Sequence, residues 1–330
     1  VNNYTELEKA MQKKNTYIGI VTIEGAHVFG TGAPETDAVS KQELIKRLTQ
    51  NIHTVKNWEH PPFIINLSHH FWNHLAGHAK SFKRPINNIV NQNKGKNKGI
   101  TEAGWHVIRE LLSTQNGKRI LIDTKHMSIA SRKEYYEFVG NHNYINPNHK
   151  IPIISSHACA NGYKTMDSSI KEADLIVKTR KSHFFKWSIN ISDEEAKIIH
   201  DSEGLIGLMV DKGNMGGIDF IKEISEIKDI AKQRKAFAHL FLDNAFQLVK
   251  AVGKRSGWDM IAFGSDFDGT ITHMDPYPTV ASMPLFRQDL ISFLEEKEYQ
   301  KELWFDYTPE EIIEKIFYKN AMDFYKKFFV

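Results

Sequence analysis

The sequence of 330 residues predicts an α/β fold with parallel strands. Six short apolar runs alternate with amphipathic helical patterns, and the apolar runs end in polar residues. Strands that are buried on both faces read as continuous apolar runs, and a helix between consecutive strands is the usual connection in a parallel sheet. The alternation therefore favours a sheet with helices packed outside it.

The predicted elements follow one another in chain order. Several helical patterns close on glycine, and Ser192 with acidic residues after it is a sound helix start. A helix is also predicted at 2–15, where no strand precedes it. The predicted strands are 16–24, 62–70, 119–126, 151–157, 204–210 and 259–266, and the predicted helices between them include 102–117, 131–141, 192–204 and 235–257.

Such a series predicts a (β/α)8 barrel of the TIM type, with a single barrel domain over 1–330. Six strands are two fewer than the eight that close such a barrel. We expect the two missing strands at the N-terminus, because the chain enters with a helix and begins with Val1 rather than Met. The prediction is therefore an N-terminally incomplete barrel that contains strands three to eight.

The composition excludes several classes of protein. The 43 basic and 40 acidic residues give a net charge of +3 and are scattered, so the chain has no phosphate-tracking surface and nucleic acid is not an expected partner. No apolar run approaches the roughly 20 residues that span a bilayer, which predicts a soluble protein. Cys159 is the single cysteine, which excludes an internal disulfide and a cysteine-based zinc cluster. Both the cytoplasm and the periplasm suit this composition.

Polar side chains stand where five of the predicted strands end. In a barrel the carboxyl ends of the strands converge on one face, and that face carries the active site. One histidine there would more simply be structural, but imidazoles and carboxylates together are ligands that suit zinc and similar divalent ions. A glutamate can also bridge two metals about 3.5–4 Å apart. The residues are Glu24, His69, His126, His157 and Asp266.

Two loops and several other histidines are less informative. The connection 163–187 is too long for an ordinary βα turn, so we expect it to cover the site. The polar connection 84–99 is expected to be a solvated loop. His70, His74 and His78 have a helical i, i+4, i+8 spacing, but without H-E-x-x-H they are expected to form a loop and helix start rather than a metal-binding face. His27 and His273 have no assigned role.

The stretch "GSDFDGTIT" (264–272) permits a second interpretation. It resembles the D-x-D-G-T motif of haloacid dehalogenase-type phosphatases, in which the first aspartate attacks phosphorus. That fold needs further strands after the motif, and the 60 residues that follow Thr270 read as loop and helix. The chemistry is therefore assigned to Asp266 at the strand end, and Asp268 is expected to be a turn residue.

Six segments resemble, in order, motifs of the membrane (renal) dipeptidase family, the zinc peptidases of family M19 among the amidohydrolase-type barrels. They extend over nearly the whole chain. Each is modest evidence alone, whereas their order and spacing are specific. The segments are "VTIEGAH" (21–27), "NLSHHFWNHLAG" (66–77), "GITEAGWHVIREL" (99–111), "IDTKHMS" (122–128), "PIISSHACA" (152–160) and "IAFGSDFDG" (261–269).

The resemblance implies a metal-dependent dipeptidase and a role for each matching residue. Glu24 would bridge one or two divalent ions, expected to be Zn²⁺, and His126 and His157 would bind the second ion. Asp266 would lie at the first ion, orient the attacking hydroxide and pass its proton to the leaving amine. His69 would bind the substrate and stabilise the oxyanion of the tetrahedral intermediate. A small peptide is the implied substrate, and a homodimer is compatible with it.

The sequence departs from the family pattern in two places. The family's first strand ends in H-x-D, which holds the first zinc, whereas the only H-x-D here is at 273–275, after the last predicted strand. The family's arginine for the substrate carboxylate is replaced by Ile189, which cannot form bidentate hydrogen bonds. Arg180 is the candidate replacement, with Lys178, Lys181 and Lys186 nearby. Two alternatives therefore stay open: a non-catalytic binding or structural barrel, and a related amidohydrolase acting on another amide or an ester.

Overall fold

A computed structural model describes the chain except for residues 83–85, 87–88 and 173–179. The chain divides into two compact units, which are described separately. The first unit comprises residues 1–154 and 323–330, and the second comprises 155–322. The single barrel domain over 1–330 stays a prediction.

The first unit is built on parallel strands that pair in chain order. Thr22 pairs with Ile64, and Ile64 pairs with Leu121. Asp123 then pairs with Ile154, where the next strand begins. The elements are α1 (Tyr4–Met11), β1 (Thr22–Ile23), α2 (Lys41–Lys56), β2 (Ile64–Asn66), α3 (Glu102–Leu112), β3 (Leu121–Asp123), α4 (Ile129–Ile145) and the first residue of β4 (Ile154–Ala158), with short 3-10 turns at Ala26–Phe29 and Pro34–Ala38.

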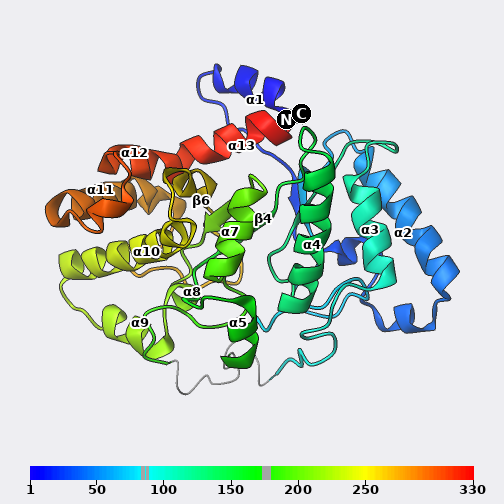
Figure 1. The fold of residues 1–330 in the computed structure, drawn as a ribbon, viewed down its shortest axis with the longest axis horizontal. Helices are drawn as coiled ribbons and strands as arrows, with labels where there is room; N and C mark the ends of the chain where they lie inside the picture. Colours follow the sequence, from blue (N-terminus) through cyan, green and yellow to red (C-terminus); the bar gives the residue numbers. More distant parts are fainter. Residues whose placement is uncertain (83–85, 87–88, 173–179) are drawn as a thin grey trace. The chain divides into compact units, whose positions relative to one another are not determined.

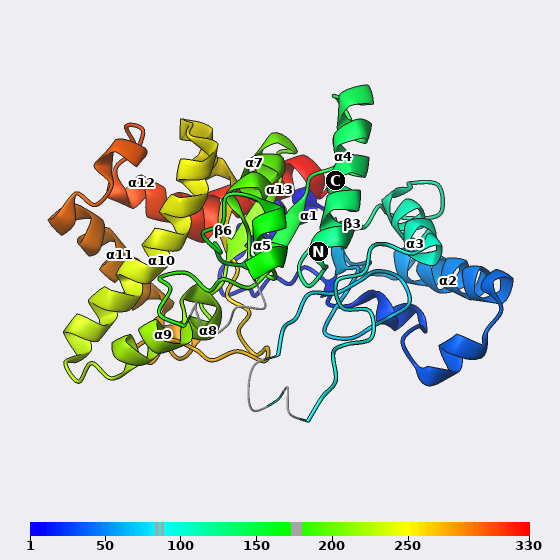
Figure 2. The same ribbon diagram turned by 60° about the horizontal axis from the view of Figure 1, so that its bottom comes forward.

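The helices of this unit begin where the sequence supplies a cap. The side chain of Ser40 accepts from the backbone N–H of Glu43 at the start of α2, and Thr101 does the same for Gly104 at the start of α3. Helices α2 and α3 lie side by side (Figures 1 and 2). Their apolar faces are removed from water, which is the main source of their stability. The buried residues include Leu48, Ile52, Ile108 and Leu111.

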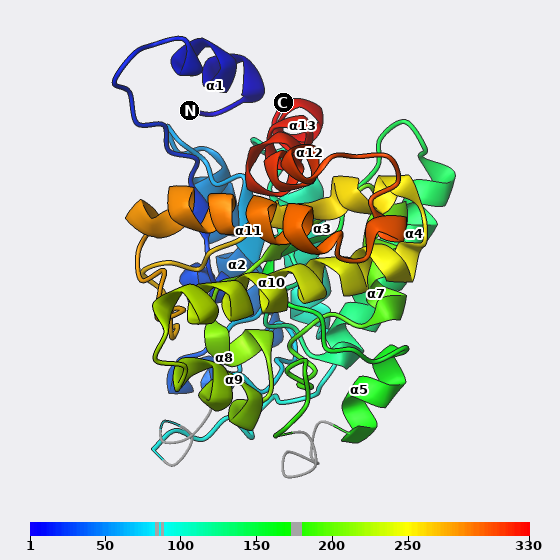
Figure 3. The ribbon, with the colours of Figure 1, turned by 90° about the vertical axis from the view of Figure 1, so that its left-hand side faces the viewer.

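The second unit continues the parallel arrangement. Strand β4 lies next to β5, and β5 pairs with β6 in parallel, with Ile206 opposite Ile261. Helices α10 and α11 run side by side (Figure 3). The elements after β4 are α5 (Met166–Glu172), α7 (Asp193–Asp201), β5 (Leu205–Leu208), α8 (Lys212–Met215), α9 (Ile218–Ser225), α10 (Ile230–Val252), β6 (Ile261–Phe263), α11 (Met283–Lys297), α12 (Pro309–Glu314), a π-helical turn (Lys315–Lys319) and the start of α13 (Asn320–Phe328). The rest of α13, from Asp323 on, belongs to the first unit.

The predicted α/β fold with parallel strands is confirmed. Each of the six apolar runs contains a strand, although the strands are shorter than the runs because the flanking residues form loops. The N-terminal helix is confirmed as α1, and Ser192 and Glu195 form a capping box at α7. β6 is the last strand among the described residues, and every residue after it is described, so the further strands that a phosphatase would need are not present.

Other predictions about the connections are only partly tested. The expected helix start at 70–78 is wrong, because this stretch forms bends and isolated bridges. The connection 163–187 contains α5, and its residues 173–179 lie outside the described part of the chain, so its predicted position over the site stays a prediction. In the described residues no helix combines the length and the apolar character needed to cross a bilayer.

Candidate metal centre

Three of the predicted site residues come together in the first unit. Glu24 directly follows β1, and His69 and His126 each lie three residues beyond the end of β2 and β3. Nε2 of His126 lies 3.0 Å from Oε1 of Glu24, and Nε2 of His69 lies 3.5 Å from the same oxygen. Because the carboxyl ends of neighbouring parallel strands lie at one edge of a sheet, residues 45 to 102 positions apart in sequence meet here.

A fourth residue, His70, joins this group. The sequence predicts only a loop and helix start at this position. The possible ligand atoms of His69, His70 and His126 all lie within 4.8 Å of one another. The ring of His70 is centred 3.9 Å from that of His69 and 4.9 Å from that of His126. Its position directly after His69, just beyond a strand end, was the available signal, and the helical spacing to His74 and His78 obscured it.

Hydrogen bonds hold the His70 ring in place. Nδ1 of His70 lies 2.8 Å from Oγ of Ser81, which also accepts from Nε2 of Gln92 at 2.8 Å. Oε1 of Gln92 accepts from the backbone N–H groups of Ser81 and Phe82, which fixes the orientation of the amide. When Nδ1 of His70 donates to Ser81, Nε2 keeps its lone pair for a ligand. Such outer hydrogen bonds orient histidine ligands in metal sites.

The backbone is strained at the predicted site residues. His126 has a φ of +68° and Asp266 a φ of +58°, in the left-handed region that few side chains adopt. Gly25, directly after Glu24, has a φ of +112°, and a Cβ there would lie 2.4 Å from the His27 ring. Strained conformations of this kind cost about 1–3 kcal/mol each and cluster at functional sites. The strain therefore supports a functional role for the loops that carry Glu24, His126 and Asp266.

The remaining histidines of the segment serve other purposes. Nε2 of His74 lies 3.5 Å from Oδ1 of Asp37. His78 is fully buried, and its two ring nitrogens lie 3.0 Å from the carbonyl oxygens of Ala79 and Lys94. These partners point in different directions, so the i, i+4, i+8 spacing builds no shared metal-binding face.

His27 lies beside the group rather than within it. Its ring stacks at 6.2 Å from the ring of His69. Burial, and then the charge of His69, lower the pKa of His27 below its ordinary value. His27 is therefore held more strongly in its neutral form than an exposed histidine would be.

His157 and Asp266 belong to the second unit. His157 is buried on β4, with Nδ1 2.8 Å from Oγ of Ser156. Asp266 follows β6, and its backbone oxygen accepts from the N–H of Gly269 at 3.1 Å. Gly264, which begins the G-S-D motif, packs so closely that a Cβ would lie 2.1 Å from the Ser156 oxygen. The glycine is therefore required by the approach of the neighbouring chain segments.

Two further aspartates of the predicted motifs lie in a turn and in an ion pair. Asp268 is exposed and lies in a turn, which confirms its predicted place. The carboxylate of Asp275 in the H-x-D at 273–275 accepts from Nζ of Lys212 at 2.5 Å. That ion pair engages the one carboxylate of this H-x-D, so the tripeptide offers no independent metal site in the second unit.

The candidate substrate residue Arg180 is paired within the second unit. Its guanidinium donates three hydrogen bonds of 2.6 to 3.1 Å to the carboxylate of Asp219. Ile189 is buried, in keeping with an apolar residue where the family has arginine. Nζ of Lys186 lies 4.3 Å from the centre of the Tyr163 ring. Lys178 lies outside the described residues.

The donor set in the first unit fits a divalent cation. One carboxylate oxygen and the nitrogens of three imidazoles lie at the end of three short strands, and these are the ligand types that zinc prefers. Each histidine here can turn a lone pair toward a cation only in its neutral form, so metal binding competes with protons. The geometry therefore supports a metal centre built on Glu24, His126 and the neighbouring imidazoles.

Comparison with known proteins gives structural matches. No family model and no curated protein sequence matches the chain. Dipeptidase AC, a metallopeptidase of family M19, matches with a TM-score of 0.59 and 16% identity over 100% of this chain and 71% of that one. The chain has the fold of the M19 metallopeptidases. A metallopeptidase from Rhodobacter sphaeroides, liganded with a phosphinate mimic of the dipeptide L-Ala-D-Ala, matches with a TM-score of 0.58 and 15% identity, covering 99% of this chain and 68% of that one.

An amidohydrolase from Pseudomonas aeruginosa also matches this chain in structure. Its TM-score is 0.58 and its identity 16%, over 100% of this chain and 78% of that one. At identities of 15% and 16% these matches show the fold. At the level of the fold, they confirm the resemblance that the six sequence motifs indicated. Roles of individual residues must be argued from the site itself.

Proposed function

We propose that this protein is a metal-dependent dipeptidase. The observation that carries the proposal is the position of Oε1 of Glu24, 3.0 Å and 3.5 Å from Nε2 of His126 and His69, beyond the carboxyl ends of parallel strands. The M19 fold supports it, since one protein of this fold was crystallised with a dipeptide mimic. The sequence motifs around the same residues support the same reaction.

The proposed metal ligands are Glu24 and His126, with His70 as an additional donor within reach. His157 and Asp266 belong to the second unit, and we include them on the ground of the family resemblance alone. Zinc is the proposed ion, in one or two copies. A divalent ion bound there would polarise the peptide carbonyl and increase the acidity of water.

The other residues of the proposal handle protons and charge. Asp266 would accept a proton from the attacking water as the C–O bond forms, and deliver it to the leaving amine when the tetrahedral intermediate collapses and the C–N bond breaks. His69 would donate a hydrogen bond to the oxyanion that develops on the carbonyl oxygen. These two roles rest on the resemblance and on the position of each residue after a strand.

Recognition of the substrate carboxylate is assigned to Arg180. Guanidinium groups bind carboxylates through two parallel hydrogen bonds. The carboxylate of Asp219 already accepts hydrogen bonds of 2.6 to 3.1 Å from the Arg180 guanidinium, so a substrate carboxylate would have to compete with Asp219. The replacement Arg180→Lys should therefore raise KM for a dipeptide more than it changes kcat.

One alternative has an observation in its favour. The match to a bacterial amidohydrolase supports hydrolysis of an amide other than a dipeptide, because the same fold accommodates it. We also propose that the protein forms a homodimer. Light scattering, which measures the molar mass in solution, tests this.

The test combines metal content with hydrolysis. The purified full chain is loaded with zinc, and its metal content is measured by mass spectrometry. Hydrolysis is followed on a panel of dipeptides with L- or D-residues at the second position, by release of free amino acids, and on simple non-peptide amides, by release of the amine. We expect stoichiometric zinc and zinc-dependent release. Bound zinc without release from any dipeptide would overturn the dipeptidase proposal and leave the metal centre standing, whereas release from amide substrates alone would favour the amidohydrolase.

A further inference from the structure

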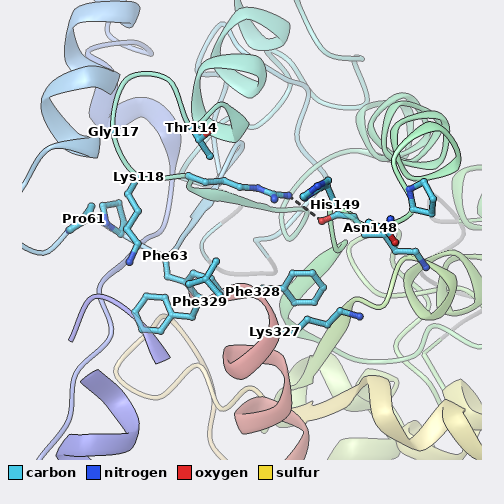
Figure 4. A pocket seen from close by; sticks show the side chains of 15 residues that line it. Pro61, Phe63, Thr114, Gly117, Lys118, Asn148, His149, Lys327, Phe328 and Phe329 are labelled. Atoms are coloured by element: carbon cyan, nitrogen blue, oxygen red, sulfur yellow. Dashed lines mark hydrogen bonds between the residues drawn. The ribbon is translucent and has the colours of Figure 1, made fainter. Parts of the chain in front are cut away.

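The first unit contains a second hollow, lined by aromatic and basic side chains. Its volume is about 470 Å³, which lies within the range of roughly 300–1,000 Å³ typical of small-molecule sites. Figure 4 shows Phe63, Lys118, Phe328 and Phe329 around it. It differs from the candidate metal centre in both position and chemistry.

The hollow lies where the strands begin. Phe63 directly precedes β2, Arg119 lies two residues before β3, and Lys150 lies four residues before β4. The candidate metal centre follows the other ends of β1, β2 and β3. The two sites therefore occupy opposite ends of the same strands and share no lining residue.

Basic side chains line the hollow. They are Lys118, Arg119, Lys150 and Lys327, and none of the described lining residues is an aspartate or a glutamate. Burial lowers the pKa of both Lys118 and Arg119; the charge of Glu6 opposes this effect at Lys118. Lys118 and Arg119 are thus cations that are partly removed from water.

One donor in the hollow is left without a partner. Nη2 of Arg119 donates to the carbonyl oxygen of Lys150 at 3.2 Å, the dashed line in Figure 4. Nε of Arg119 is buried and makes no hydrogen bond. A buried donor without an acceptor is unfavourable. The guanidinium has further N–H groups, which suit an anionic ligand.

An apolar floor accompanies these donors. Phe63 and Phe329 are buried, with ring centroids 4.7 Å apart. Nζ of Lys118 lies 5.1 Å from the centre of the Phe329 ring, within the range of a cation–π contact. Pro61 and Pro147 add rigid apolar surface. A ligand that suited this hollow would therefore carry an apolar body as well as a negative group.

We propose that this hollow binds a small organic oxyanion, a carboxylate or phosphate attached to an apolar body. Arg119 and Lys118 hold the oxyanion, and the body packs on Phe329 and Phe63. Arginine suits both groups, because its planar donors match carboxylate and phosphate oxygens. This site is independent of the proposed dipeptidase activity.

The experiment measures binding to the full chain by calorimetry. The probes are phenyl phosphate, phenylacetate, inorganic phosphate and benzyl alcohol. We expect at least one aromatic anion to bind about tenfold or more tightly than both inorganic phosphate, which lacks an apolar body, and benzyl alcohol, which lacks a negative group. The two aromatic anions identify which oxyanion the site prefers.

Variants locate the binding. Arg119→Gln and Lys118→Gln should each weaken the preferred anion about tenfold, a loss typical of a charged hydrogen bond. Lys46→Gln removes the same charge from an exposed position of α2 and should leave binding unchanged. Because Arg119 is partly buried, Arg119→Lys and the thermal unfolding midpoint show whether a loss reflects misfolding.

Three results would overturn the proposal. These are no binding of either aromatic anion, equal binding of benzyl alcohol, and full binding by a folded Lys118→Gln and a folded Arg119→Lys or Arg119→Gln protein. None of them bears on the metal centre, since the test requires neither metal nor peptide substrate.

Discussion

In the first unit, the side chains beyond the carboxyl ends of the strands differ in charge from those before the amino ends. Beyond the carboxyl ends, Glu24 and a group of imidazoles offer oxygen and nitrogen lone pairs. Before the amino ends, Lys118, which lies over the Phe329 ring, and Arg119 offer N–H donors. The first arrangement suits a cation and the second suits an anion, although both are built on the same short strands.

Positive φ angles occur at both ends, but at different residue types. Beyond the carboxyl ends they include a histidine, His126, as well as Gly25, whereas in the lining of the hollow the residue with positive φ is Gly117, at +110°. Glycine adopts such angles without the strain that a side chain causes. His126, a proposed ligand, therefore bears backbone strain that surrounding contacts must offset.

The largest expected effect is a loss of zinc affinity of about 100-fold or more in Glu24→Gln, because a neutral amide replaces the carboxylate among the proposed ligands. Calorimetric titration with zinc measures it. Glu35→Gln changes an exposed glutamate of the same unit and should bind zinc normally. An unchanged zinc affinity in Glu24→Gln would show that Glu24 is not a ligand. It would also contradict the proposed contrast between the two ends of the strands.

Strain at the carboxyl ends predicts the next effect. Gly25→Ala should lower the free energy of unfolding by about 2 kcal/mol, roughly a 30-fold change in the folded-to-unfolded ratio, because alanine is disfavoured at a φ of +112°. Denaturant unfolding measures the change. Gly19→Ala is the matched control, since its Cβ would meet nothing within 4 Å. Equal stability of both variants would mean that the Glu24 loop is not strained.

A smaller effect tests His70. Ser81→Ala removes the hydroxyl 2.8 Å from Nδ1 of His70 and should weaken zinc binding about tenfold, as removal of outer hydrogen bonds does in metal sites. Ser113→Ala, at the end of α3, provides a control for the loss of a hydroxyl. If both variants bind zinc with wild-type affinity, His70 is a neighbour of the centre and not one of its ligands.

The smallest expected effect is the most direct test of independence between the two ends. Removal of metal with EDTA should change the affinity for the preferred aromatic anion by about twofold or less, because separated sites without shared partners contribute additively. Calorimetry on the stripped and zinc-loaded chain compares them. A larger change would show that the strands couple the two sites.

Much of the fold was predictable from local pattern. Apolar runs of strand length and the Ser192 helix start depend on neighbouring residues, so the six strands and helices such as α7 were correctly predicted. The same pattern overestimated the strand lengths, since apolar residues at the ends of a run pack equally well as loop. It also suggested a helix start at 70–78, where tertiary contacts of His74 and His78 hold a loop instead.

The site divides in the same way. Glu24, His69 and His126 could be selected from sequence because each follows a strand, and parallel strands bring such positions together. His70 has the same signal, but its helical spacing to His74 and His78 obscured it, and the contacts with Ser81 and Gln92 that hold its ring come from the tertiary structure. The assignment of His157 and Asp266 to the same centre stays a prediction.

The sequence by itself determined the order and type of the elements and the residues at the strand ends, because these follow from local hydrophobic periodicity. Only the tertiary structure decided that the imidazole of His70 lies beside those of His69 and His126, and that Arg119 and Phe329, 210 positions apart, line one hollow. Contacts such as that between Phe63 and Phe329 depend on which distant surfaces pack together, and a single sequence carries no local signal for that.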